Sequence, residues 1–451
     1  MPLDRLPELA SFDSHGEGVR IPPGVTVPLT PRVRQLLDTA EMRRLARVGQ
    51  LGLVSLVYPG AVHGRLEHSL GVYRLALAFL ARLRHDPRFA ATVDEADAGA
   101  FLVAALVHDI GHWPFCHPIE DMGLPIFPRH ETLVHDILSH GEPGDVLARS
   151  WGLDPGRVAA LITGTARDPA GLILHSLLSG PIDVDKMDYL RRDSLHAGVP
   201  YGRHFDEERL LASLCLDRQG TAVAITDKGR TAAEMLVFAR YVMFSEVYWH
   251  HAVRSATAML QRAVWHVRDR IEPDRIVRLD DADFIASLSR LGAGTPAAPL
   301  VEGLFGHRRV LFKRVASFDA LRHPAIHRAL AGRNYEEKVA VAEQLSAACG
   351  VATHASQGGS PILLDAPPAE REVEFKLSVR DRIRGPAHPE AFRWTAFAEL
   401  SPVVRSLAHE QFDDIVKRVR IFAPAEVAAT IASRPDLEDI VLEAAGRVKR
   451  S

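Results

Sequence analysis

Three histidines and one aspartate lie within the ten residues HDIGHWPFCH, at positions 108–117. Imidazole and carboxylate groups are ligands for divalent transition metals, and His108 stands directly before Asp109. Two adjacent side chains can reach one ion only where a helix is ending, and Gly111 and Pro114 are residues that end helices. The stretch therefore predicts half of a metal site. The structural alternative is a helix end whose dipole stabilises nearby histidines.

The other ligands must come from distant parts of the chain. Upstream, His68 lies in RLEHSLGV (65–72), and downstream the segment IDVDKMDYLRRD (182–193) carries four aspartates, which include Asp185. Together with the His-Asp pair, these residues form a mixed nitrogen and oxygen set of the kind that binds transition metals. We therefore expect a divalent metal as the cofactor: Mn, Fe, Mg, Ni, Co or Zn.

Helices are predicted to bring these segments together. The apolar run 98–107 has the length of a buried helix and is too short to cross a membrane. A second helical pattern begins near Leu66 and contains His68. If Asp185 lies in a helix, it shares a face with Tyr189, four residues further on.

The order His…His-Asp…Asp resembles the metal-binding signature of the HD-domain phosphohydrolases. Four ordered segments also look like the deoxynucleoside triphosphate (dNTP) triphosphohydrolases of that superfamily, which include the SAM-and-HD-domain proteins and the bacterial dGTPases. These segments are YPGAVHGRLEHSLGV (58–72), LVHDIGHWPFCH (106–117), RHE (129–131) and IDVDKMDYLRRDS (182–194). The resemblance implies an enzyme that releases deoxynucleoside and tripolyphosphate. Its implied metal ligands are His68, His108, Asp109 and Asp185.

The resemblance places catalytic groups beside the metal, at His112, His117, Glu120 and His130. Histidines there would bind phosphate oxygens or transfer protons near neutral pH. Glu120 lies three residues after His117, so on a helical turn it could hydrogen-bond to that histidine and keep it protonated. Whether His117 or His130 gives the proton to the leaving oxygen stays open.

A nucleotide pocket is implied as well. Tyr189 looks like the aromatic residue that stacks against the sugar and leaves no room for a 2′-hydroxyl. Gln50 and Asp193 look like the pair that binds the 3′-hydroxyl. The implied triphosphate and nucleotide clamp consists of Arg65, Lys186 and Arg240. The implied substrate-binding set is completed by Leu51 and Tyr248.

Several of these positions also have a purely structural interpretation. Arg191 and Arg192 are better explained as neutralising the aspartates of their own segment, and Lys186 has the same alternative. From sequence alone, Gln50 is better explained as a polar residue of a surface loop. Most aromatic residues in the region 231–268 are expected to pack in the core.

The composition is that of a large globular protein: 451 residues, 47% of them hydrophobic, with a formal net charge of −3. This charge does not support nucleic-acid binding as the main function, although a local basic pocket is compatible with it. The three cysteines contain no CxxC pattern and predict no disulfide framework. Because the N-terminus lacks a basic-then-apolar signal pattern, we expect a cytoplasmic protein without membrane association. We further expect a homo-oligomer, either a dimer or a tetramer.

We predict a mainly α fold with an N-terminal extension (1–31), an HD-domain helical core (32–270) and a mixed α+β C-terminal region (271–451). A small β-hairpin is expected at 214–225. Residues 1–30 are predicted as loop or short strand, 31–48 as helical with a break near Thr39, and 231–268 as a long helical stretch. Strands are expected further on, at 310–315, 362–364, 373–379 and 416–422. The helices expected there are 335–349, 403–409 and 425–432.

Hydrolysis of dNTPs is the leading hypothesis for the function. The second is an HD-domain phosphodiesterase or nucleotidase that acts on other phosphate esters. A non-catalytic nucleotide sensor is the third, and the intact metal set together with His117 disfavours it. A nucleic-acid binder or nuclease is the fourth.

Overall fold

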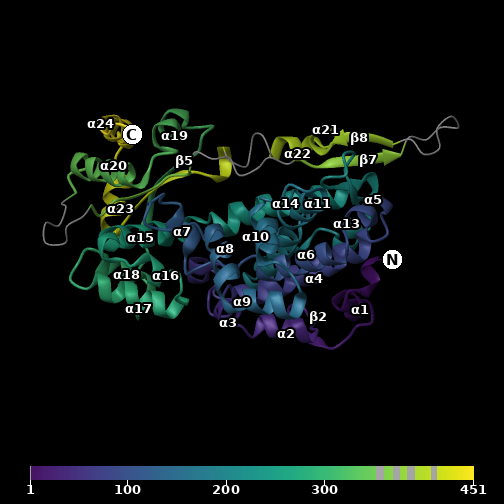
Figure 1. Cartoon of the computed structure of the whole chain (residues 1–451). Helices are drawn as coiled ribbons and strands as arrows, with labels where there is room; N and C mark the ends of the chain where they lie inside the picture. Colours follow the sequence, from purple (N-terminus) through teal and green to yellow (C-terminus); the bar gives the residue numbers. More distant parts are fainter. Residues whose placement is uncertain (1, 352–359, 369–375, 383–391, 408–413, 451) are drawn as a thin grey trace.

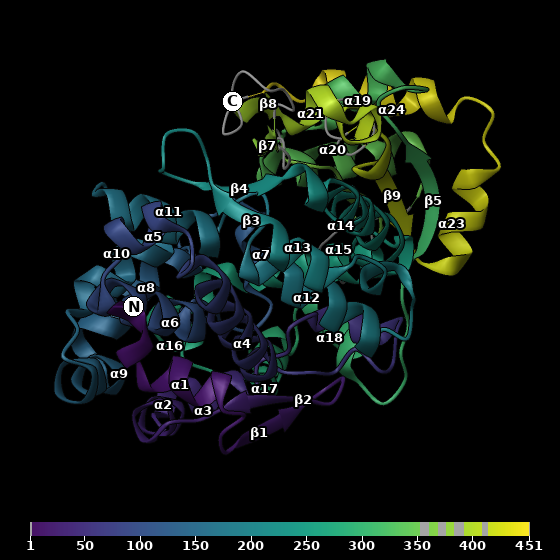
Figure 2. The ribbon, with the colours of Figure 1, turned by 90° about the vertical axis from the view of Figure 1, so that its right-hand side faces the viewer.

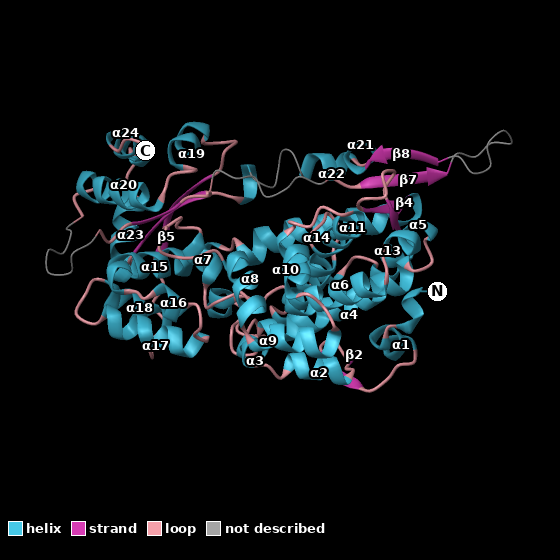
Figure 3. Cartoon of the chain, viewed as in Figure 1, coloured by secondary structure: helices cyan, strands magenta, loops and turns pink. Residues whose placement is uncertain are grey.

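The computed structural model describes residues 2–351, 360–368, 376–382, 392–407 and 414–450. Helices dominate this part of the chain, and the strands are short (Figure 3). The predicted mainly α class is confirmed. Figure 1 shows a large helical body, with much of the C-terminal region lying along one side of it.

Three helices form the centre of the body: α4 (Arg65–Leu83), α6 (Glu95–Val107) and α12 (Val184–His196). Helix α6 is apolar on all sides, and its residues 98–107 are buried, as the apolar run predicted. The Asp94 carboxylate caps this helix by accepting a hydrogen bond from the backbone N–H of Asp97 at 2.8 Å. Helix α4 packs against both α6 and α12.

Helices α4 and α12 approach each other closely at Gly71. A Cβ atom at this position would overlap with the side chains of Asp188 and Arg192. Glycine in a helix interior costs about 0.5–1 kcal/mol relative to alanine. Here it leaves the room that the two α12 side chains occupy, so a residue with weak helix propensity sets the spacing of two central helices.

Further helices surround this centre. They are α2 (Pro31–Leu37), α3 (Ala40–Leu45), α5 (Pro87–Thr92), α7 (Cys116–Glu120), α8 (His130–His140), α9 (Glu142–Val146), α10 (Pro155–Thr163), α11 (Pro169–Leu178) and α13 (Glu207–Ser213). The predicted break near Thr39 is confirmed, because this residue separates α2 from α3. Short 3₁₀ turns cover Pro2–Arg5, Gly52–Leu56, Tyr201–Arg203, Asp227–Gly229 and Arg268–Arg270.

The N-terminal residues are more ordered than predicted. Helix α1 (Pro7–Asp13) replaces part of the expected loop, and Pro7 lies in its first turn. Proline is suited to this place because the N–H groups of a first turn have no acceptor within the helix. Leu9 in this helix is fully buried. The expected short strands are confirmed as the antiparallel pair β1 (Gly18–Ile21) and β2 (Val25–Pro28). This hairpin lies on the side of the body opposite the C-terminal elements (Figure 2).

The long helical stretch predicted over 231–268 is confirmed, but it is interrupted. The segment forms α14 (Arg230–Met243), a π-helical turn (Phe244–Tyr248) and α15 (His251–Val267). The imidazole of His250 restarts the helix by accepting a hydrogen bond from the backbone N–H of Ala252 at 3.3 Å. The interruption directs the Tyr248 hydroxyl to Asp193 in α12 at 2.7 Å, a contact that hydrophobic periodicity does not encode.

The predicted hairpin is confirmed as β3 (Leu214–Leu216) and β4 (Val223–Thr226), which pair antiparallel. Two later strands extend it: β7 (Ser378–Arg382) pairs with β4 in parallel, and the unpredicted β8 (Phe392–Ala396) pairs with β7. A second sheet has the order β5-β9-β6. Its strands are β5 (Lys313–Phe318), β6 (Leu363–Asp365) and β9 (Val419–Ala423).

The predicted C-terminal strands and helices match the structure within a few residues, except where part of 373–379 and 403–409 lies outside the described residues. The predicted helices are α20 (Tyr335–Ala348), α22 (Pro402–Ser406) and α23 (Ala425–Ala432). The unpredicted helices described here are α16 (Pro273–Ile276), α17 (Asp281–Gly292), α18 (Ala297–Phe305), α19 (Pro324–Leu330), α21 (Phe397–Leu400) and α24 (Leu437–Arg447). One apolar cluster joins Leu53, Trp113, α15 and Phe422. The proposed domain limits stay a prediction.

Among the described helices, none combines the length and the apolar character that a membrane span requires. The longest, α4, carries both arginine and glutamate.

Candidate metal centre

Three of the four predicted metal ligands, His68, His108 and Asp185, place ligand atoms within 4.8 Å of one another, and Asp109 contacts His108. His68 comes from the first turn of α4, His108 and Asp109 from the end of α6, and Asp185 from the first turn of α12. The Nε2 atom of His108 lies 3.2 Å from Nε2 of His68, 3.3 Å from Asp109 Oδ1 and 3.8 Å from Asp185 Oδ1. Nε2 of His68 lies 3.0 Å from Asp185 Oδ1. The assignment of these four side chains as metal ligands stays a prediction.

The orientation of the two imidazole rings fits a bound cation. The Nδ1 atom of His108 donates to the carbonyl oxygen of Ala105 at 2.9 Å, and Nδ1 of His68 lies 2.8 Å from the Asp188 carboxylate. When both rings are neutral and donate from Nδ1, both Nε2 atoms present lone pairs to each other. A positive charge between them removes the repulsion. A carboxylate that accepts from the other ring nitrogen, as Asp188 does from His68, is typical of histidines that bind metal.

Electrostatics support the same interpretation. Burial opposes protonation of His68, but hydrogen bonds to Asp185 and Asp188 raise the pKa of this histidine to about 10. Burial also disfavours the charged form of Asp109, yet nearby His112 and His108 hold the pKa of its carboxyl well below the ordinary range. The centre is therefore an anionic position that takes up either a proton or a metal ion.

A chain of charged groups holds His68 from behind. Arg192 donates to both oxygens of Asp188 at 2.7 Å and to Glu67 at 2.6 Å. The neutralising role expected for Arg192 is confirmed. The partner predicted for Arg191 was wrong. Arg191 forms an ion pair with Glu207 in α13 rather than with an aspartate of its own segment.

The turn that follows α6 is fixed by an arginine that sequence analysis missed. Arg44, from α3, donates to the carbonyl oxygens of His112 at 2.8 Å and Ile110 at 3.0 Å. Arg65 donates to Asp109 Oδ2 at 2.8 Å. The two arginines therefore hold the turn that carries His108 and Asp109 from its backbone and from its carboxylate side chain.

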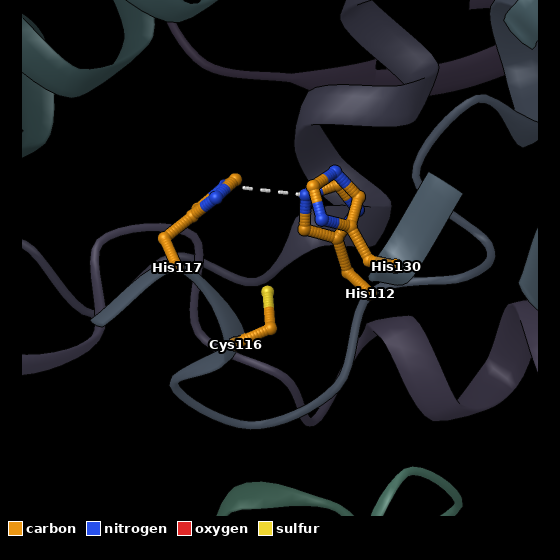
Figure 4. Close-up of side chains that lie close together, drawn as sticks. All are labelled: His112, Cys116, His117 and His130. Carbon is orange, nitrogen blue, oxygen red and sulfur yellow. Dashed lines mark hydrogen bonds between the residues drawn. The ribbon is translucent and has the colours of Figure 1, made fainter. Parts of the chain in front are cut away.

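A second group of side chains lies beside the metal centre and is called the histidine cluster: His112, Cys116, His117 and His130 (Figure 4). Nε2 of His112 lies 3.3 Å from Nε2 of His117, and the ring centroids of His112 and His130 are 3.9 Å apart. Nδ1 of His112 lies 3.1 Å from Asp109 Oδ1, which connects the cluster to the metal centre.

The expected pairing of Glu120 with His117 was wrong. Glu120 accepts hydrogen bonds from the backbone N–H of His130 and contacts its Nδ1, both at 2.9 Å. The start of α8 supplies unpaired N–H groups, which attract the carboxylate, while His117 turns toward His112. Desolvation in the pocket, with the positive charges of Arg65 and His130, lowers the pKa of His117 to about 3, so this ring is not held protonated.

Two residues of the predicted clamp pair with carboxylates. Lys186 donates from Nζ to Asp183 at 2.6 Å, which is the structural alternative stated for it. Arg65 contacts Asp109, as described above, and its buried Nε has no hydrogen-bond partner among the described residues. The third, Arg240, lies 5.4 Å from the ring centroid of Phe244.

Residues of the predicted sugar pocket form a connected group. Asp193 accepts from the Tyr248 hydroxyl at 2.7 Å and contacts Nε2 of His63 at 2.9 Å. The backbone N–H of Gln50 donates to the His63 carbonyl at 2.9 Å. The side-chain oxygen of Gln50 is buried, so the alternative interpretation of Gln50 as a polar residue of a surface loop does not fit the structure. The half-buried Tyr189 lies edge-on to Tyr248, with 6.4 Å between ring centroids.

Three residues that belong here were not predicted from the sequence: His63, Arg44 and Asp188. A usable signal existed for Asp188, which lies three residues after Asp185, and for His63, which lies in the matching segment 58–72. Leu51 packs beside this region as a partly buried residue of the main apolar core. For Arg44 the sequence holds no such signal, since its contacts depend on how α3 docks.

Comparison with known proteins assigns the chain to a family. The model of the HD domain matches residues 65–197, and the model described as HD associated region matches residues 205–443, more than half of the chain. The protein belongs to the HD-domain family that carries this associated region.

Relatives and solved structures agree with this assignment. The Bacillus subtilis protein YwfO, described as uncharacterized, is 36% identical over 229 residues, which cover 50% of each chain. The deoxynucleoside triphosphate triphosphohydrolase SAMHD1 of Danio rerio is 27% identical over 273 residues, or 52% of this chain and 43% of that protein. The chain thus spans about half the length of the curated relatives it matches. A crystal structure of a hypothetical protein from Aquifex aeolicus shares the fold, with a TM-score of 0.67, 24% identity and coverage of 92% and 99%.

Proposed function

We propose that the protein is a metal-dependent dNTP triphosphohydrolase that releases deoxynucleoside and tripolyphosphate. The observation that carries this proposal is the convergence of His68, His108, Asp109 and Asp185 next to three further histidines. The similarity to proteins named as dNTP triphosphohydrolases supports the choice of substrate. When bound, a divalent ion supplies Lewis-acid chemistry, which polarises phosphate oxygens and lowers the pKa of water from about 15.7 toward about 7.

Arg65 and Lys186 act on the charge of the triphosphate. Both cations are paired with carboxylates, Asp109 and Asp183, so neither is a bare charge before substrate arrives. A triphosphate carries several negative charges and competes for these donors, which hold more N–H groups than one carboxylate uses. We propose that the cations orient the triphosphate with its α-phosphate toward the histidine cluster.

His117 and His130 are the proposed proton-transfer groups for the leaving 5′-oxygen. Glu120 is hydrogen-bonded to Nδ1 of His130, whereas the lowered pKa of His117 favours the neutral form of that ring. A neutral His117 suits a role as acceptor, and a carboxylate-paired His130 suits a role as donor. We therefore propose that His130 is the general acid.

Tyr189 and Asp193 are proposed to select the sugar. Burial raises the pKa of Tyr189 to about 12, so its phenol stays neutral and can pack against the ring. A 2′-hydroxyl would overpack the contact at about 1–3 kcal/mol, and an unpaired buried hydroxyl costs a similar amount. The preference for deoxy substrates is then on the order of 10²-fold. The Asp193 carboxylate keeps lone pairs for the 3′-hydroxyl beside its contacts with His63 and Tyr248.

The test is product analysis. The protein is incubated with each dNTP in Mn²⁺ or Mg²⁺, and early products are followed by phosphorus NMR and nucleoside chromatography. We expect deoxynucleoside and intact tripolyphosphate. A nucleoside monophosphate would instead place the protein with the phosphodiesterases or nucleotidases, and binding without turnover would make it a sensor. The expected homo-oligomer stays a prediction that light scattering tests.

A further inference from the structure

Four metal-ligating side chains meet in the histidine cluster, outside the metal centre described above. They come from the turn after α6 (His112), from α7 (Cys116 and His117) and from the start of α8 (His130). One ligand atom from each residue lies within 4.8 Å of the other three. Figure 4 shows the Cys116 thiol pointing toward the space between His117 on one side and His112 and His130 on the other.

The ring contacts favour a cation at this position. Nε2 of His112 and Nε2 of His117 face each other at 3.3 Å, as the two histidines of the metal centre do at 3.2 Å. Glu120 contacts Nδ1 of His130, so Nε2 is the nitrogen left to bind an ion. A carboxylate that contacts one ring nitrogen of a histidine orients the other ring nitrogen toward a metal ion.

Cys116 gives the cluster a chemistry that the first centre lacks. Its side chain is buried, and the preceding residue, Phe115, adopts a left-handed conformation with φ of 54°, which sets the turn into α7. Burial raises the pKa of this thiol to about 12, so the free group is protonated.

We propose that His112, Cys116, His117 and His130 form a second metal site, which takes a tetrahedral, thiophilic divalent ion such as Zn²⁺. Three imidazoles and one thiolate match the ligand types of zinc sites, whereas Mn²⁺ and Mg²⁺ prefer oxygen ligands. Binding exchanges one proton for the metal: the S–H bond of Cys116 breaks, an S–metal bond forms, and one H⁺ passes to solvent. The consequence for activity rests on the proposed function: an ion there occupies the imidazoles that would transfer protons, so it inhibits.

Cobalt titration tests the site directly. Co²⁺ is added to metal-free protein, and the thiolate-to-cobalt charge-transfer absorption is measured in the wild type and in Asp185→Ala. We expect the absorption in both, because Asp185 belongs to the other centre. It should disappear in Cys116→Ser and Cys116→Ala. The matched controls, Cys215→Ser and Cys349→Ser, should keep it.

The affinity for Zn²⁺ gives the magnitude. Loss of a group that is hydrogen-bonded to a metal ligand lowers metal affinity about 10–100-fold. Loss of the Cys116 thiolate, which is itself a ligand, should therefore lower the affinity for Zn²⁺ by at least about 100-fold. In the Asp185→Ala background, X-ray absorption of the Zn²⁺ form should show one sulfur at about 2.3 Å and nitrogens at about 2.0–2.1 Å. This measurement needs no cysteine variant and so does not depend on how Cys116→Ser folds.

Two results would overturn the proposal: no thiolate absorption in wild-type protein, or an absorption that persists in folded Cys116→Ser. A zinc spectrum without sulfur would do the same. Activity provides a separate readout, the ratio of dNTP hydrolysis in Mn²⁺ with and without added Zn²⁺, which should approach one in Cys116→Ser. If no dNTP is hydrolysed while the cobalt absorption is present, the proposed function fails and the metal site stands.

Discussion

The metal centre and the histidine cluster are neighbours, yet their side chains are held in different ways. At the metal centre, Asp188 and the Ala105 carbonyl fix the second nitrogen of His68 and His108. In the histidine cluster, a carboxylate fixes His130, while His117 is positioned against another ring, that of His112. The first arrangement is preorganised for one ligand geometry. The second leaves rings that can exchange between proton transfer, phosphate binding and metal binding.

The largest expected effect comes from breaking the metal centre. His108→Ala removes the ligand that lies within 4 Å of the other three, so both bound Mn²⁺ and turnover in Mn²⁺ should be lost. Elemental analysis and product formation measure the two losses. Asp439→Ala, an exposed carboxylate of α24, is the control and should keep both. Full metal occupancy in His108→Ala would refute the ligand assignment.

A change in the histidine cluster should separate the two groups. His117→Ala is expected to lower kcat by roughly 10²–10⁴-fold, the usual contribution of a general acid or base, because it removes a proton-transfer group. The Mn²⁺ content should stay that of the wild type, since His117 is not a ligand of the metal centre. Metal loss together with activity would show that the two groups are one site.

A third variant sharpens the comparison because it touches neither group. Tyr189→Ala should reduce the preference for dNTPs over ribonucleotides by on the order of 10²-fold, through the overpacking argument given above. Rates on matched deoxy- and ribonucleotides measure this ratio, and metal analysis serves as the control. Equal discrimination in variant and wild type would contradict the role of Tyr189.

The smallest effect tests preorganisation itself. Asp188→Asn keeps the shape of the side chain behind His68 but removes its charge, so metal affinity should fall about 10–100-fold. Titration of metal-free protein with Mn²⁺ gives the affinity. Glu120→Gln is the equivalent change in the histidine cluster and should leave Mn²⁺ binding at the metal centre unaltered. An unchanged affinity for Mn²⁺ in Asp188→Asn would contradict the proposed role of the carboxylate behind His68.

The same contrast explains what the sequence could predict. The apolar run before His108 and the spacing of its ligands define helix ends, and helix ends follow from local residue types. The partner of Glu120 could not be predicted, because it depends on where α8 begins relative to α7 across the loop of residues 121–129. The π-helical turn at Phe244–Tyr248 escaped for a similar reason: its surrounding residues have a continuous helical pattern, and the tertiary contact of Tyr248 with Asp193 accompanies the interruption.

Gly71 makes this protein a difficult subject for stabilisation by design. A glycine inside a long helix is an obvious candidate for replacement by alanine, with an apparent gain of about 0.5–1 kcal/mol in helix propensity. Here the added methyl group would overlap with Asp188 and Arg192, the groups that hold His68. An engineer who ranks substitutions by propensity alone would therefore select a position three residues from a metal ligand.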